Sequence, residues 1–187
     1  MMKRVCVLGC LNNNAGNAIK DEMLAWLKQY YDVFVVSHDG TKFEYPAIYY
    51  TIKASIELNQ PILYLHTKGA AHDYIWVRTP RNNQTEIRKF WKREFTKNAD
   101  AYFNYDNSST LVTTPMLEDD GKTIFNSFVL YPNAAKLLQK TFHLDSNRFY
   151  YEDMFSSIPE IELKGIVKHR APESEIRQYI ETVVFDE

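Results

Sequence analysis

The sequence predicts an α/β fold built on a central, mostly parallel twisted sheet that is flanked by helices. Three apolar runs, at residues 5–8, 33–36 and 62–65, are continuous rather than alternating. Continuous runs are typical of parallel strands that are covered on both faces. Helical patterns separate the runs, and this alternation implies right-handed crossovers in a doubly wound sheet. With 187 residues, of which 45% are hydrophobic, the chain can bury a substantial core.

Two helices are expected between these strands. In the first, apolar residues recur from Ile19 to Tyr30 at the spacing of one helix face. The second is an apolar segment over residues 47–58, which follows Pro46 and is closed by Asn59-Gln60-Pro61.

The pattern changes beyond residue 65, where a polar loop precedes a long helix. Apolar residues repeat every four positions in this helix, namely Ile87, Trp91, Phe95, Ala99 and Phe103. Later predicted elements are a strand at 109–114, an acidic turn at 118–121, an aromatic run at 124–131, a helix opened by Pro132, a short helix near 152–156, and strands at 161–167 and 182–185. No repeat or linker divides the chain, so one domain is expected over residues 1–187.

Charge and composition exclude some functional classes. The net charge is −2, so no broad basic face for nucleic acid is expected. No run of 18 apolar residues occurs and the first residues are too polar for a signal peptide, so we expect no membrane span. Cys6 and Cys10 lie four apart in a strand, roughly 13 Å, which is beyond disulfide reach. A cytoplasmic location is therefore expected.

Polar residues follow each of the three strands. In open parallel sheets, ligands bind beyond the carboxyl ends of the strands. Leu11 and Asn12 follow the first strand and Asp39 follows the second. Neither a GxGxxG fingerprint nor a P-loop is present. Simple turns remain an alternative for the Asn-rich loop and for Asp39.

The third strand ends in His66-Thr67-Lys68-Gly69. If the strand continues, His66 and Lys68 point to the same side because strand side chains alternate. The two side chains then present two donors to a diphosphate.

The stretch Tyr64-Leu65-His66-Thr67-Lys68-Gly69, the Trp- and Arg-bearing helix after it, and the stretch 147–153 resemble a family of GT-A-fold glycosyltransferases. The resemblance extends over roughly residues 3–170. Members of the family include polysaccharide-synthesis enzymes and the amino-terminal glycosyltransferase domain of a chlorella virus protein.

The resemblance implies a GT-A-like, nucleotide-diphospho-sugar transferase fold with a nucleotide-binding half at residues 1–65 and an acceptor and catalytic half at 66–187. It implies an inverting transfer from a UDP-linked donor, such as UDP-glucose or UDP-rhamnose, to a glycan or glycoprotein acceptor, as in capsid or polysaccharide glycosylation. The chain can be one domain of a longer protein, and for a viral protein the compartment is the host cytoplasm. The uridine nucleotide is implied to contact Leu11, Asn12 and Asp39.

The sequence departs from the family where most GT-A enzymes carry an Asp-x-Asp metal motif. His66-Thr67-Lys68 occupies this place. Two solutions are open: Lys68 with a basic loop residue, Arg78 or Arg81, neutralises the diphosphate, or Asp73 and the phosphates hold Mn²⁺ or Mg²⁺. We expect that a metal participates.

Glu152 and Asp153 resemble the Glu-Asp pair of inverting enzymes. In that pair the carboxylate at the Asp153 position takes the proton of the acceptor hydroxyl, and it must lie within about 3 Å of that hydroxyl. Glu152 is the neighbour that orients Asp153 or binds acceptor hydroxyls. The alternative is that both are helix N-terminal acids that the helix dipole favours.

Two other classes of function stay open. One is a metal-dependent phosphohydrolase or nucleotidyltransferase that uses Asp39, Asp73 and Asp153. The other is a non-catalytic module that binds a nucleotide sugar or a glycan, and the absent Asp-x-Asp is the observation that favours it.

Overall fold

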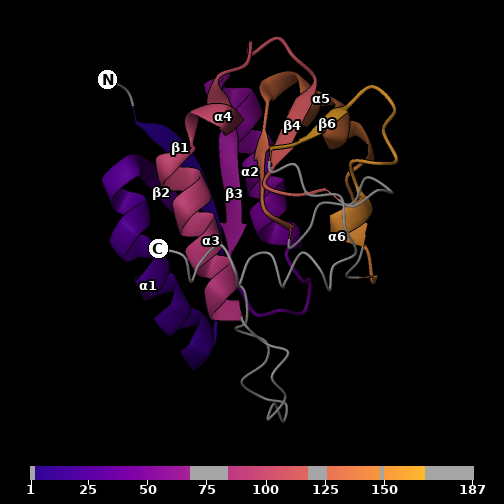
Figure 1. The fold of residues 1–187 in the computed structure, drawn as a ribbon. Helices are drawn as coiled ribbons and strands as arrows, with labels where there is room; N and C mark the ends of the chain where they lie inside the picture. Colours follow the sequence, from indigo (N-terminus) through magenta and orange to yellow (C-terminus); the bar gives the residue numbers. More distant parts are fainter. Residues whose placement is uncertain (1–2, 68–83, 118–125, 148–149, 167–187) are drawn as a thin grey trace.

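The computed structural model describes residues 3–67, 84–117, 126–147 and 150–166 (Figure 1). Within them the chain forms a mixed six-stranded sheet in the order β2-β1-β3-β5-β4-β6. β5 runs antiparallel to its neighbours β3 and β4, and the other pairings are parallel. The predicted α/β class, with a mostly parallel sheet flanked by helices, is therefore confirmed.

The first half of the chain forms the elements that the apolar runs predicted, and β1 and β2, with 8 residues each, extend well beyond their runs. In chain order these are β1 (Arg4–Leu11), α1 (Asn14–Tyr30), β2 (Tyr31–His38), α2 (Tyr45–Leu58) and β3 (Ile62–His66). Pro46 lies in the first turn of α2, where its missing N–H costs no helical hydrogen bond. Asn59 ends α2 in the left-handed conformation (φ 48°), which Asn tolerates better than most residues.

The second half is more irregular. Its elements are α3 (Gln84–Lys97), α4 (Asp100–Phe103), β4 (Leu111–Thr114), β5 (Phe128–Leu130), α5 (Pro132–Thr141), α6 (Tyr150–Asp153) and β6 (Glu162–Gly165). The helix opened by Pro132 is confirmed. The predicted short helix begins two residues earlier than expected and ends at Asp153. The predicted strand at 182–185 lies outside the described residues.

The single long helix predicted through Phe103 is wrong, because the chain forms α3 and α4 with a break at Asn98. At the break two backbone hydrogen bonds span three residues, Ala101 N–H to Asn98 O (2.9 Å) and Tyr102 N–H to Ala99 O (3.0 Å). This change turns Tyr102, in place of Phe103, into the core. There its hydroxyl donates to the buried Glu94 Oε2 (2.8 Å), so the polar contact and the ring packing together favour the break.

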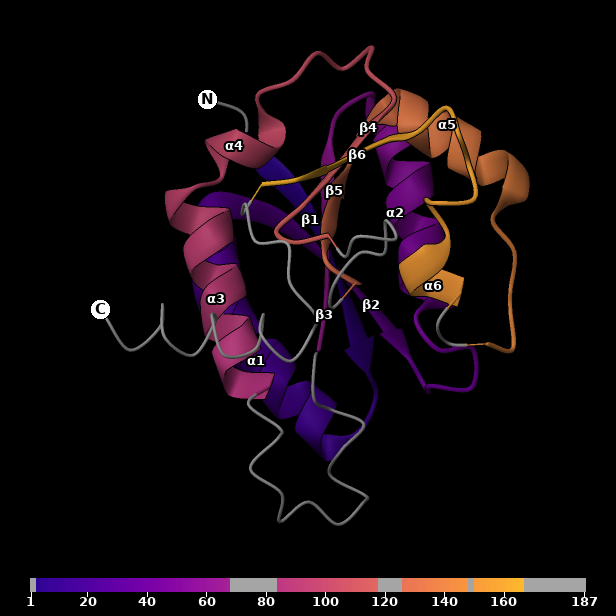
Figure 2. The ribbon, with the colours of Figure 1, turned by 45° about the vertical axis from the view of Figure 1, so that its right-hand side comes forward.

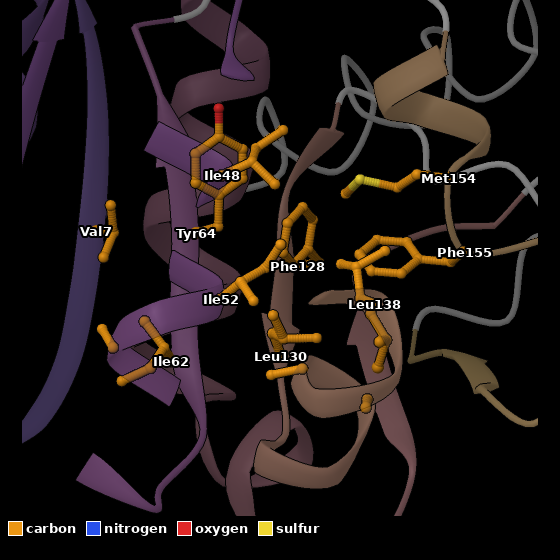
Figure 3. Packing of buried hydrophobic residues seen from close by; sticks show 14 of the residues in the cluster. Val7, Ile48, Ile52, Ile62, Tyr64, Phe128, Leu130, Leu138, Met154 and Phe155 are labelled. Carbon is orange, nitrogen blue, oxygen red and sulfur yellow. The ribbon is translucent and has the colours of Figure 1, made fainter. Parts of the chain in front are cut away.

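Helices cover the sheet on both faces, and Figure 2 shows the two layers. α1 and α3 pack on one face, where Leu8, Leu63 and Trp91 belong to the core. α2, α5 and α6 pack on the other face, where Tyr64, Phe128 and Phe155 belong to a second core (Figure 3). The two helical layers bury alternate residues of β1 and β3, as side chains that alternate along a strand require.

The prediction that helices cover both faces of β2 is wrong, because neighbouring residues on its two faces are exposed. Phe34 and Val35 are 42% and 40% exposed. The physical reason is its place at the edge of the sheet, where one flank has no neighbouring strand among the described residues. Phe34 instead packs against the exposed Tyr50 of α2, with 5.9 Å between ring centroids.

The two cysteines are free and buried. They lie four positions apart on β1, and burial raises the pKa of both thiols. In the described part of the chain, no helix combines the length and the apolar character that crossing a bilayer requires.

Candidate functional site

The strand order reverses at β1. The chain first places β2 on one side of β1, and then crosses to place β3 on the other side. In open α/β sheets such a reversal opens a crevice at the carboxyl ends of the two strands, and ligands bind there. The residues that follow β1 and β3 are therefore the candidate site.

Hydrogen bonds join the carboxyl ends of the three parallel strands. The Leu11 N–H donates to Thr67 Oγ1 (3.1 Å), and the Thr67 N–H donates to Gly9 O (2.9 Å). On the other side, the Asn12 N–H donates to His38 O (2.7 Å). Asn12 is exposed at this edge and Leu11 is half-buried. Leu11, Asn12 and the end of β3 thus lie together, as the sequence predicted.

The first turn of α1 sits directly behind this edge. Asn13 caps the helix, because its Oδ1 accepts from the Gly16 N–H (2.6 Å). Gly16 is buried, and a Cβ built on it would overlap the carbonyl oxygen of Leu11. The absence of a side chain at Gly16 therefore lets the positive end of the helix dipole approach the end of β1.

Asp39 lies in an exposed turn beyond β2. Its Oδ1 accepts from the Thr41 N–H (2.9 Å) and from the Thr41 hydroxyl (2.7 Å). These hydrogen bonds lower the pKa of Asp39, so its carboxyl group is ionised at neutral pH. Asp39 is therefore a turn residue, as one of the two interpretations of the sequence predicts. The same turn holds its carboxylate beyond the carboxyl end of β2.

His66 lies at the end of β3 with its ring between the two cores. The ring stacks on Tyr64 at an interplanar angle of 4°, and its centroid is 5.5 Å from that of Trp91. Its Nδ1 is 3.1 Å from Glu44 Oε1. This placement agrees with the predicted position of His66 at the edge of the candidate site.

Glu44 was not predicted as a site residue. Its Oε1 lies beside His66, and its Oε2 accepts hydrogen bonds from the Tyr64 hydroxyl (3.2 Å) and from the side-chain amide of Asn126. The sequence offers no local signal for this group, because its members come from the start of α2, from β3 and from the segment before β5.

His38 ends β2 beside the same group. Its Nδ1 is buried and has no hydrogen-bond partner among the described residues. Burial lowers the pKa of His38 below its usual range, and the charges of Glu44 and Asp39 oppose this effect only in part.

We predict that His38 makes the fold less stable in acid. Because the folded protein binds this proton more weakly than the unfolded chain does, the free energy of unfolding falls as the pH drops through the ordinary imidazole range near 6.5. Urea unfolding between about pH 8 and pH 5 should show a shallower fall for His38→Asn than for the wild type. Equal slopes for His38→Asn and the wild type would contradict the prediction.

The helix α6 carries Glu152 and Asp153. Buried Tyr151, Met154 and Phe155 anchor it on the face that α2 covers, and Phe155 packs edge-on to Phe128 at 4.9 Å. Tyr151 also lies near the segment just before α2, where its ring centroid is 6.5 Å from that of Phe43. The Asp153 side chain is half-buried.

Four predicted site residues, Lys68, Asp73, Arg78 and Arg81, lie outside the described residues. Within the described ranges, no group of three or more His, Cys, Asp or Glu residues is arranged to hold a metal ion.

Comparison with protein-family models, with curated proteins and with solved structures gives no match.

Proposed function

We propose that the chain is a glycosyltransferase with a GT-A-like fold, which moves a sugar from a UDP-linked donor to a glycan acceptor with inversion. The observation that carries the proposal is the reversal of strand order at β1 and β3, with Asn12 and His66 at its edge. The mixed, mostly parallel sheet and the position of His66-Thr67 at the end of β3 also support it.

In this proposal the nucleotide binds across the ends of β1 and β2, near Leu11, Asn12 and Asp39. The ionised carboxylate of Asp39 can accept hydrogen bonds from a base or a ribose. The diphosphate binds toward the end of β3, where His66, Lys68 and a basic loop residue, Arg78 or Arg81, oppose its charge.

The acceptor hydroxyl attacks the anomeric carbon from the face opposite the diphosphate. The new bond forms between this oxygen and the anomeric carbon as the bond from that carbon to the diphosphate oxygen breaks. UDP leaves with the electron pair, and Asp153 takes the acceptor proton as general base. Glu152 orients Asp153 or binds acceptor hydroxyls. Asp73 with substrate phosphates would hold a divalent ion that offsets the leaving charge.

We predict that UDP raises the melting temperature more than GDP, CDP or ADP, because the site reads the base. A ligand that binds only the folded state stabilises it by mass action. Thermal-shift assays with each diphosphate, with and without Mn²⁺, measure this. Equal shifts for all four would remove the case for a base-reading site.

Asp39→Ala should reduce the UDP shift. The matched control is Asp106→Ala, which removes a similar exposed turn in which Oδ1 accepts from the Ser108 N–H (2.9 Å), away from the carboxyl ends of the strands. This control should bind UDP like the wild type. Binding without turnover on any acceptor would favour the non-catalytic module, and release of phosphate or pyrophosphate without an acceptor would favour the phosphohydrolase or nucleotidyltransferase.

A further inference from the structure

The two edges of the six-stranded sheet differ in length and in charge. β2 forms one edge with eight residues, and β6 forms the other with four. β6 carries Glu162 and Lys164, and both are exposed. Short edge strands and charged side chains, lysine above all, keep the edge of a sheet from pairing with another chain. The β6 edge is therefore protected against such pairing.

The β2 edge lacks this protection over its centre. Residues 33–37 include no charged residue and no proline. β2 pairs with β1 in register over all eight residues, so no bulge twists this edge away. In the described part of the chain, no strand pairs with the outer flank of β2. Its backbone groups thus form a regular template for a further strand.

Apolar side chains are exposed on both faces of β2. Val33 packs on the core that α1 covers, and Val36 packs on the core that α2 covers. Because side chains alternate along a strand, exposed Val35 projects on the α1 face and exposed Phe34 on the α2 face. Phe34 continues into the exposed ring of Tyr50 on α2. A contiguous exposed apolar patch of this kind marks an interaction surface.

The strand is complementary to itself when two copies pair antiparallel about a two-fold axis at Val35. Directly opposite residues then project on the same face, so Val35 is opposite Val35, and Phe34 is opposite Val36 of the second copy. Asp32 is opposite His38, which places a carboxylate opposite an imidazole. An axis at Phe34 would instead place Asp32 opposite Val36. The register about Val35 therefore groups apolar residues at the centre and polar residues at both ends.

We propose that the outer flank of β2 is a homodimer interface, at which two copies of the chain pair antiparallel about a two-fold axis at Val35. Identical strands related by this axis satisfy each other's backbone groups and close the assembly, and the charged β6 strands remain at the outer edges of the joined sheet. The antiparallel pairing directs the carboxyl ends of the two β1 strands oppositely, so each copy keeps a candidate site of its own. The interface does not rest on the proposed function.

The first test is the mass of the full chain in solution. Sedimentation velocity at about 100 µM should give twice the 22.0 kDa mass of one chain. Val35→Lys should give a monomer, because the two introduced charges would be opposite each other at the axis. Leu144→Lys, at an exposed apolar residue on the loop after α5, is the matched control and should remain a dimer. A monomeric wild type, or a Val35→Lys protein that is still dimeric, would overturn the proposal.

The second test reports the register and holds even if Val35→Lys fails to fold. Directly opposite residues of an antiparallel pair have Cα atoms roughly 4.5–5.5 Å apart, which is within disulfide range. Mild oxidation of Val35→Cys, stopped with an alkylating agent, should therefore give a covalent dimer on a non-reducing gel. The native Cys6 and Cys10 are buried, so the wild type should give none.

Ser37→Cys is the matched control for the register. It lies on the same face, two residues along the exposed edge, and the proposed pairing holds its two copies roughly 13 Å apart. It should therefore cross-link far less than Val35→Cys. Equal cross-linking of the two variants, or no cross-link in Val35→Cys, would overturn the proposal.

Discussion

Asp153→Asn should lower sugar transfer by about 100-fold or more, while UDP binding stays near the wild-type value. Asparagine keeps the size of the side chain and removes the base that would take the acceptor proton. The fold should be preserved, because asparagine matches aspartate in size and keeps the backbone carbonyl that accepts from Ser156. Buried Tyr151 and Phe155, which anchor α6, are unchanged.

The measurement is UDP release with a panel of UDP-sugars and glycan acceptors, together with UDP affinity. The control is Glu160→Gln, an exposed acid shortly after α6, which should transfer sugar at the wild-type rate. Near-normal turnover of Asp153→Asn would mean that the base lies elsewhere, with Asp73 the next candidate. A product of retained anomeric configuration would rule out the single-base inverting mechanism.

Gly16→Ala should destabilise the fold by about 2–3 kcal/mol and abolish most UDP binding. Helix propensity alone would make the Gly16→Ala protein more stable by roughly 1 kcal/mol. A loss of stability therefore indicates the steric overlap. It is decided by the carbonyl of Leu11, which a Cβ at this position would overlap. To relieve the overlap, the first turn of α1 must move away from the end of β1.

Urea unfolding and UDP titration measure both effects. Asn14→Ala, at an exposed position in the same helical turn, is the matched control and should leave stability and UDP binding close to the wild type. A Gly16→Ala protein as stable as this control would contradict the close approach of helix and strand.

The first half of the fold could be predicted because its signals are local. Each apolar run is buried by crossovers that lie next to it in the chain, so continuous hydrophobicity and the intervening helical periods identify the elements. The same signal failed for β2, since an apolar run does not reveal that its strand lies at an edge with Phe34 exposed. It failed again at Asn98, where the contact of Tyr102 with Glu94 overrides the four-residue period.

The candidate site shows the same division. The position of Leu11, Asn12 and His66 at the carboxyl ends of β1 and β3 could be predicted from the apolar runs that precede them. The role of Thr67 in joining two strand ends, and the convergence on Glu44, could not, because each depends on the register between distant segments. Phe43, directly before Glu44, has a left-handed backbone (φ 49°), and a phenylalanine in the sequence does not predict that conformation.

The most direct test of a UDP site at the reversal of strand order is a ¹⁵N NMR titration of the full chain with UDP, up to millimolar concentration. The proposal predicts that the largest shifts fall on the amides of Leu11, Asn12, Asn13 and Thr67, at the carboxyl ends of β1 and β3. Shifts confined to other elements, such as α5, or no shifts at all, would contradict it.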